Sequence, residues 1–116
     1  MFSLGGTDKF LLYVRPTDMR KGFDGLCGLV ANDLGQDPVN GSVYIFINRA
    51  RDRAKLLHWR PGGFVLYYKR LESGTFERPV HDENTCGLRL GYAQLVMLMD
   101  GITIANITRR KRHKKA

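Results

Sequence analysis

The run from Pro16 to Gly35 constrains the fold most, because it combines a helical apolar pattern with signals for a helix end on both sides. Pro16 favours an extended residue before it, and Thr17 or Asp18 can cap the first free N–H groups of a helix. Gly35 can end that helix. The apolar positions follow the spacing of one buried helical stripe: Met19, Phe23, Leu26, Cys27, Val30 and Leu34. The sequence therefore predicts a long helix over residues 17–34.

Two features of this run are unusual for a helix. Three glycines occur at steps of three residues, namely Gly22, Gly25 and Gly28. Each lowers helix stability by about 1 kcal/mol relative to Ala, which favours close packing of another backbone, with ligand contact as the alternative. Arg20 and Lys21 oppose the helix dipole in a first turn. They either pair with Asp18 and Asp24 or bind an anion or a partner.

Strand-like segments cover Lys9–Val14, Val43–Asn48, Lys55–Arg60, Phe64–Arg70 and, more weakly, Gly87–Leu90. Val43–Asn48 is apolar on both faces, which is typical of a central strand. Short turns join it to the next two strands, so we expect an antiparallel meander. Tyr92–Asp100 has helical spacing and ends at Gly101. The fold class is therefore α+β: an antiparallel sheet of four to five strands in the order β-α-β-β-β-α, packed by a long N-terminal helix and a shorter C-terminal helix.

A length of 116 residues and a hydrophobic content of 43% indicate one domain with a single core. We expect this domain over residues 1–108, followed by a basic tail over residues 109–116 that is too polar to order itself. The sequence has no apolar run of about 20 residues and no signal peptide at its start. We therefore expect a cytoplasmic protein with no membrane contact. Cys27 and Cys86 lie far apart without a CxxC motif, which argues against a disulfide or zinc site.

The net charge of +8 is concentrated in two segments. Residues 49–70 contain seven Lys and Arg against one acid, and residues 109–116 contain six against none. Such clustering favours a polyanionic partner. The candidate nucleic-acid-binding residues are the cations of the central hairpin, its neighbours, the helix start and the tail: Arg49, Arg51, Arg53, Lys55, Arg20, Lys21, Lys69, Arg70, Arg109, Arg110, Lys111 and Arg112.

The hairpin tip is the strongest candidate site. Its arginines alternate along the chain, so a β-ribbon can hold them along a phosphate backbone. The planar guanidinium suits phosphate. Three aromatic residues lie on neighbouring strands, where a ring either stacks on a base or belongs to the core: Trp59, Tyr67 and Tyr68. The alternative for the tip is an ordinary solvated turn.

The chain lacks the usual signatures of catalysis. It contains no Gly-rich phosphate loop, nucleophile elbow, His-Glu-x-x-His motif or paired metal-ligand motif. Its acidic residues are scattered without a recognisable spacing. His58, in an apolar strand, is more typical of a hydrogen-bonded sheet residue than of a catalyst. We therefore expect no enzyme, no cofactor, no metal and no small-molecule substrate.

Two long motifs carry a resemblance to a known family: Pro16–Leu26 and Gly63–Phe76. The basic hairpin Asn48–Trp59 and the segment Gln94–Ile102 fit as well. Together they resemble the TnpB accessory protein, encoded by the second open reading frame of insertion sequence 66 elements. The resemblance covers nearly the whole chain. One departure is Asp100-Gly101, where the family tends to have Glu-Gly.

The resemblance implies a bacterial mobile-element protein needed for transposition beside a separate transposase that carries the strand-transfer carboxylates. It assigns no catalytic residue to this chain. Two roles follow as expectations. The protein contacts DNA, at the element ends, through its basic hairpin, or it is an adaptor that binds the element's transposase without touching DNA.

Overall fold

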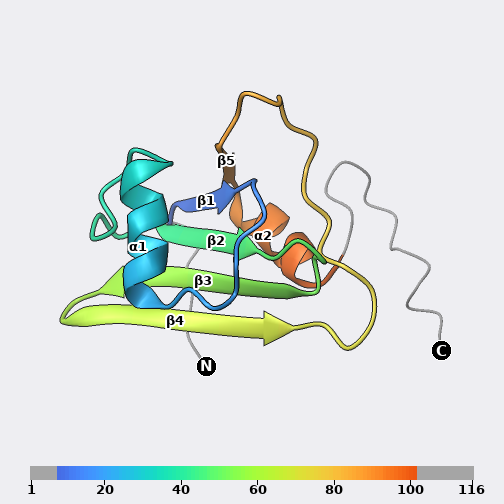
Figure 1. Cartoon of the computed structure of the whole chain (residues 1–116), viewed down its shortest axis with the longest axis horizontal. Coiled ribbons are helices and arrows are strands. Elements are labelled where there is room, and N and C mark those ends of the chain that lie inside the picture. Colours follow the sequence, from blue (N-terminus) through green and yellow to red (C-terminus); the bar gives the residue numbers. More distant parts are fainter. Residues whose placement is uncertain (1–7, 102–116) are drawn as a thin grey trace.

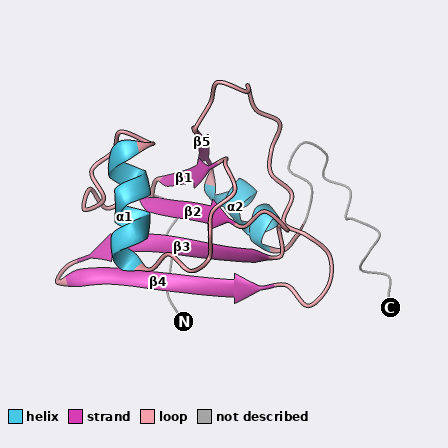
Figure 2. Ribbon diagram, viewed as in Figure 1, coloured by secondary structure: helices cyan, strands magenta, loops and turns pink. Residues whose placement is uncertain are grey.

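A five-stranded mixed sheet forms the middle layer of the protein, between two short helices (Figure 1 and Figure 2). The computed structural model describes residues 8–101. Its elements are β1 (Phe10–Tyr13), α1 (Phe23–Asn32), β2 (Val43–Ile47), β3 (Arg53–Arg60), β4 (Gly63–Arg70), β5 (Gly87–Leu90) and α2 (Tyr92–Met99). The strand order in the sheet is β4-β3-β2-β1-β5. The predicted α+β class, the meander and the second helix are confirmed.

The prediction of an antiparallel sheet is wrong for one strand pair. β1 and β2 run parallel, with Phe10 opposite Val43, whereas every other neighbouring pair is antiparallel. The reason is that α1 carries the chain from the end of β1 back to the start of β2, as in a βαβ unit. The β-α-β order was therefore predicted, but its consequence for strand direction was not.

The N-terminal helix is also shorter than predicted. α1 has 10 residues and begins at Phe23, because the preceding segment is tied to the sheet. The Thr17 N–H donates to the Ile47 carbonyl at 2.9 Å. The Lys55 ammonium donates to the carbonyls of Met19 and Lys21, each at 2.8 Å. These carbonyls therefore have a partner outside a helix, and the chain crosses the sheet before it coils.

The two faces of the sheet bury separate apolar clusters. Every residue of β2 is buried, which confirms its predicted central position. On the α1 face, sheet residues pack against Leu26 and Val30: Tyr13, Tyr44, Phe46 and Leu57. On the α2 face, sheet residues and Phe76 pack against Leu95 and Leu98: Phe10, Leu12, Ile45 and Leu56. Each helix therefore covers one face.

The three glycines of the first helical run do not mark a close backbone approach, so that prediction is wrong. Gly22 precedes α1, and a methyl group added at Gly22 or Gly28 would meet no atom within 4 Å. At Gly25 it would meet the side chain of Lys21 at 3.1 Å. Gly35 has a φ of +63° and turns the chain away after α1. Within residues 8–101, neither helix has the length and apolarity that a membrane crossing requires.

Candidate nucleic-acid interface

The turn between β2 and β3 is shaped by the side chain of Asn48. Its Oδ1 accepts hydrogen bonds from the backbone N–H groups of Asp52 and Arg53 at 3.1 and 3.0 Å. Its Nδ2 donates to the Asp52 carboxylate at 2.8 Å. An Asn that satisfies local backbone groups in this way stabilises a tight turn. The Asn48 side chain therefore stabilises the turn that carries Arg49 and Arg51.

Arg49 and Arg51 occupy this turn. Arg49 is exposed. Arg51 has a φ of +61°, and one of its guanidinium nitrogens lies 4.0 Å from the Glu77 carboxylate. Both side chains are partly exposed to solvent, and the distance between their charged groups is long. The ion pair therefore contributes little to stability. Among residues 8–101, Arg49 therefore has no ion-pair partner, and Arg51 has only a weak one.

Arg53 and Arg70 lie directly opposite each other on β3 and β4. Together with Tyr68, whose ring is half exposed, they line a hollow of about 270 Å³. Within residues 8–101, no hydrogen bond or ion pair engages the Arg53 guanidinium, and Arg70 reaches only the exposed Glu72, at 3.6 Å. Like charges directly opposite on a sheet destabilise it. An anion held between these two guanidinium groups would remove that repulsion.

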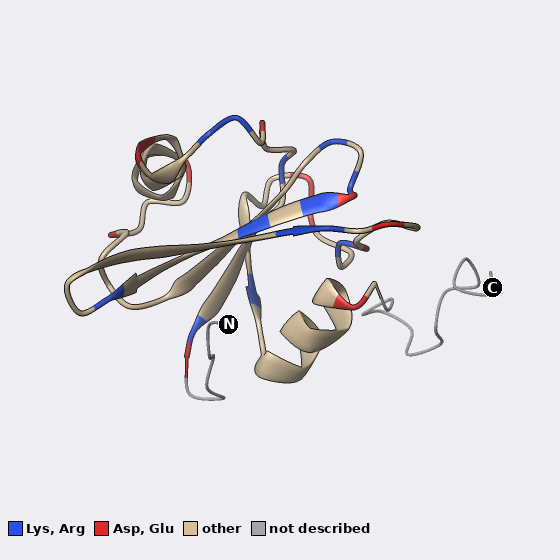
Figure 3. Ribbon diagram, turned by 90° about the horizontal axis from the view of Figure 1, so that it is seen from below, with Lys and Arg blue, Asp and Glu red and all other residues tan. Residues whose placement is uncertain are grey.

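Arg20 and Lys21 lie in the segment that crosses the α1 face of the sheet. The Arg20 guanidinium donates to both oxygens of Asp18, with a shortest distance of 2.6 Å. These hydrogen bonds lower the pKa of the Asp18 carboxyl to about 2. The predicted pairing of Arg20 with Asp18 is therefore confirmed. Both cations remain exposed. In the ribbon of Figure 3, several Lys and Arg positions lie toward one end of the sheet.

Lys55 and Lys69 do not join this surface. The Lys55 side chain is buried, its ammonium donates to two backbone carbonyls, and it lies 4.8 Å from the centre of the Tyr68 ring. The Lys69 ammonium donates to the Met99 carbonyl at the end of α2, at 3.0 Å. Their predicted contact with nucleic acid does not fit this geometry, because both ammonium groups are already bound.

The remaining candidates from the sequence are three aromatic residues and the cations of the tail. Of the three aromatic residues, Trp59 packs edge-on against Phe64, and Tyr67 packs against the core on the α2 face. Only Tyr68 adjoins the arginines. The tail residues Arg109, Arg110, Lys111 and Arg112 lie outside the described residues. We call the remaining cations the basic end of the sheet: Arg49, Arg51, Arg53 and Arg70, flanked by Arg20 and Lys21.

The remaining residues with reactive side chains include His58 and two cysteines. The buried His58 places its Nε2 atom 3.2 Å from the Gly41 carbonyl, which fits the prediction of a hydrogen-bonded sheet residue. Cys27 and Cys86 are free thiols. In this part of the chain, no three His, Cys, Asp or Glu side chains gather as they would around a metal ion.

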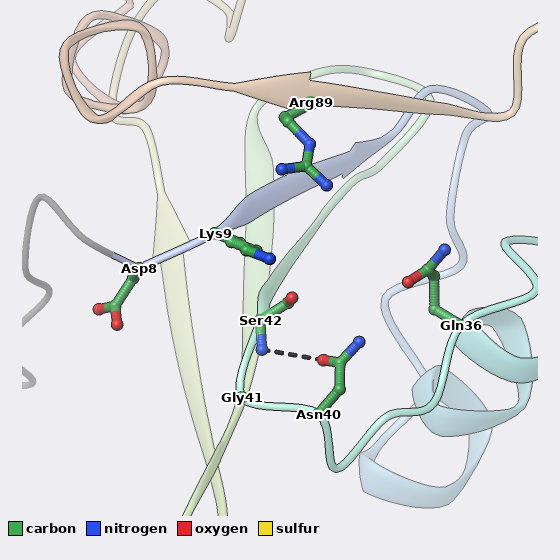
Figure 4. Close-up of a pocket in the computed structure, with 7 residues that line it drawn as sticks. All are labelled: Asp8, Lys9, Gln36, Asn40, Gly41, Ser42 and Arg89. Atoms are coloured by element: carbon green, nitrogen blue, oxygen red, sulfur yellow. Dashed lines mark hydrogen bonds between the residues drawn. The ribbon is translucent and has the colours of Figure 1, made fainter.

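A second polar cavity, of about 350 Å³, lies at the opposite end of the sheet (Figure 4). Its lining includes the exposed cations Lys9 and Arg89, from the start of β1 and from β5. The Oδ1 atom of Asn40 accepts from the Ser42 N–H and from the Tyr44 hydroxyl, each at 2.9 Å. The sequence did not reveal this cavity, because single cations far apart in the chain meet only through the pairing of β1 with β5.

The chain matches a family model described as IS66 Orf2 like protein over residues 8–109. It is 28% identical over 102 residues to the uncharacterized protein y4jC of Sinorhizobium fredii (strain NBRC 101917 / NGR234), covering 88% of this chain and 86% of that protein. It is 34% identical over 87 residues to the uncharacterized protein y4hO of the same organism, covering 74% of this chain and 73% of that protein. No solved structure gives a significant match.

Proposed function

Because the chain belongs to the IS66 Orf2-like family, we propose that it acts in transposition as a non-catalytic accessory protein that contacts DNA through the basic end of its sheet. The matched residues 8–109 include all strands and both helices of the described fold. The observation that carries the proposal is the cross-strand pair of Arg53 and Arg70 beside an exposed Tyr68 ring. This pair is unfavourable without an anion and favourable with one.

The geometry suits the DNA backbone more than a base edge. Each guanidinium can donate two parallel hydrogen bonds to phosphate oxygens. Opposite residues of an antiparallel pair have Cβ atoms about 5 Å apart, so the two forks of Arg53 and Arg70 converge on the same region. The Tyr68 ring between them and the segment of Arg20 offers a stacking surface for an unpaired base. The proposed contact is therefore mainly electrostatic and independent of sequence.

The salt dependence of DNA binding tests the proposal. Two double variants remove the same charge from opposite ends of the sheet: Arg53→Ala with Arg70→Ala, and Lys9→Ala with Arg89→Ala. The first should flatten the slope of log affinity against log salt by about two, because two phosphate contacts are lost. The second should leave that slope as it is in the unchanged protein.

If the two double variants changed the salt slope equally, DNA would be attracted by the overall positive charge. The proposal that DNA binds at the basic end would then be wrong. Circular dichroism and urea unfolding of both variants establish that each is folded before the slopes are compared. The same measurement on a chain ending at residue 108 separates the contribution of the tail from that of the sheet.

The second candidate function is an adaptor that binds the element's transposase. The observation that favours it is on α2, where Tyr92 and Val96 are exposed one helical turn apart. Co-purification of the transposase that survives nuclease treatment and is lost in a Tyr92→Ala, Val96→Ala variant would support the adaptor. Loss of co-purification on nuclease treatment would support DNA contact instead.

A further inference from the structure

β4 is a long edge strand that no other described element covers (Figure 1). It has eight residues and pairs only with β3 among the strands of residues 8–101. Natural proteins usually protect such an edge with proline, a central charge, a bulge or a covering segment. The register with β3 runs without a bulge from Arg60 opposite Gly63 to Arg53 opposite Arg70. The charged residues Lys69 and Arg70 lie only at the end of the strand.

The register also shows which backbone groups of β4 face outward. The Leu71 N–H donates to the Asp52 carbonyl at 2.8 Å, one step beyond the last ladder pair. Bonded and non-bonded pairs alternate in an antiparallel ladder, so the odd-numbered residues of β4 bond to β3. The N–H and C=O groups of the even-numbered residues point away from the sheet: Phe64, Leu66, Tyr68 and Arg70. The backbone groups of these four residues can therefore form hydrogen bonds with another strand.

We propose that a second copy of this chain pairs antiparallel along β4, so that two five-stranded sheets join into one. A two-fold axis beside Tyr67 sets Leu66 of each copy opposite Tyr68 of the other, and Phe64 opposite Arg70. This register bonds all four outward-facing residues of each strand. The interface is isologous, because the same strand of both copies meets across the two-fold axis. An axis perpendicular to the sheet also keeps α1 on the same side in both copies.

The distribution of charge along β4 selects a second copy in this orientation. Parallel self-pairing would place Lys69 beside Lys69 and Arg70 beside Arg70, which repel each other. Antiparallel pairing instead sets Arg70 opposite the Phe64 ring and Lys69 opposite Val65. A guanidinium over an aromatic face is attracted to it. The strand is thus complementary to its own reversed copy, with the apolar residues in the middle and each cation facing an apolar side chain.

The test uses the full chain, treated with nuclease, in sedimentation velocity over a range of protein concentrations. We expect a monomer–dimer equilibrium. Val65→Lys places a lysine opposite Lys69 of the other copy, so like charges meet, and this should weaken the dimer about fivefold. Val65→Glu places a carboxylate opposite Lys69 and should not weaken the dimer. Both substitutions remove the same apolar side chain, so loss of packing cannot explain a difference between them.

Amide exchange locates the interface independently of those variants. As protein concentration rises, the N–H groups of Leu66 and Tyr68 should become protected, while those of Val65 and Tyr67 are protected throughout by β3. Tyr68→Pro removes an outward N–H and should weaken the dimer more than Tyr68→Ala, which loses only the ring. The proposal is overturned by a monomer at every concentration, by equal dimerisation of the two Val65 variants, or by concentration-dependent protection at another edge.

Discussion

At the scale of single residues, the cations of residues 49–70 divide by what their side chains contact. Arg49 is exposed, and the Arg53 guanidinium has no partner within residues 8–101, whereas the ammonium groups of Lys55 and Lys69 bind backbone carbonyls. The sequence could not separate the two groups, because the Lys55 ammonium is bound by the carbonyls of Met19 and Lys21, which lie far from it along the chain. The alternation of cations along a strand predicts which side chains lie on the same face of the sheet. It does not predict which other segments pack on that face.

The buried ammonium of Lys55 should contribute measurably to stability. Lys55→Met keeps an unbranched side chain that is one atom shorter, and it removes both hydrogen bonds to the carbonyls of Met19 and Lys21. We expect a loss of about 1–3 kcal/mol in the free energy of unfolding, measured by urea denaturation. Arg49→Met, on the exposed turn, is the matched control and should change stability by less than about 0.5 kcal/mol. Equal stability of the two variants would mean that Lys55 does not hold the segment.

Tyr13 should make stability fall at alkaline pH. Burial, helped by its hydrogen bond to the Asp33 carboxylate, raises the pKa of the Tyr13 hydroxyl from 10.0 to about 12. The folded state therefore holds this proton more tightly than the unfolded state, and the resulting stability is present below pH 10 and lost as pH rises through about 12. Tyr13→Phe should be less stable at neutral pH but show a smaller decline.

Urea unfolding from neutral pH to pH 12 measures this decline in Tyr13→Phe and in the unchanged protein. Burial also raises the pKa of Tyr44, so part of the decline should persist in the variant. Two curves that run parallel across the alkaline range would contradict the assignment to Tyr13.

At the scale of elements, the predicted order β-α-β-β-β-α matches β1 to β4 and both helices but leaves out β5, which the sequence indicated only weakly. The apolar alternation of β2 and β3 and the turn between β3 and β4 are local signals, so they can be interpreted without the fold. The start of α1 and the direction of β1 relative to β2 depend on contacts distant in sequence. Thr17 bonds to Ile47, and Lys55 bonds to Met19, and neither contact leaves a local pattern. The proposed basic end shares Arg49, Arg51 and Arg53 with the predicted hairpin tip, whereas the Lys55 ammonium, also predicted there, is bound to backbone carbonyls.

The C-terminal end of α2 provides a prediction about an element. The Lys69 ammonium binds the Met99 carbonyl, where a cation also interacts favourably with the helix dipole. Lys69→Met should lower the free energy of unfolding by about 0.5–1.5 kcal/mol and speed amide exchange in α2. Lys69→Arg keeps the charge and should behave like the unchanged protein in exchange. If Lys69→Met also flattens the salt slope of DNA binding, Lys69 contacts DNA after all.

At the scale of the whole molecule, one strand takes part in both proposals. β4 supplies Arg70 and Tyr68 to the basic end, and its outer edge is the proposed contact with a second copy. The net charge of +8 acts on the two contacts in opposite directions. It attracts DNA, and it repels another copy of the same chain.

Salt should therefore strengthen self-association and weaken DNA binding in the same protein. Raising ionic strength from about 0.1 M to about 1 M shortens the Debye length from about 10 to about 3 Å, which screens the repulsion between two basic copies while their backbone pairing is little affected. DNA affinity falls over the same range, because the release of counterions into more concentrated salt gains less free energy. Sedimentation velocity and DNA titration at matched salt measure both. A dimer that dissociates as salt rises would depend on ion pairs, and the proposed pairing along β4 contains none. A DNA affinity that does not change with salt would contradict the proposed phosphate contacts of the basic end.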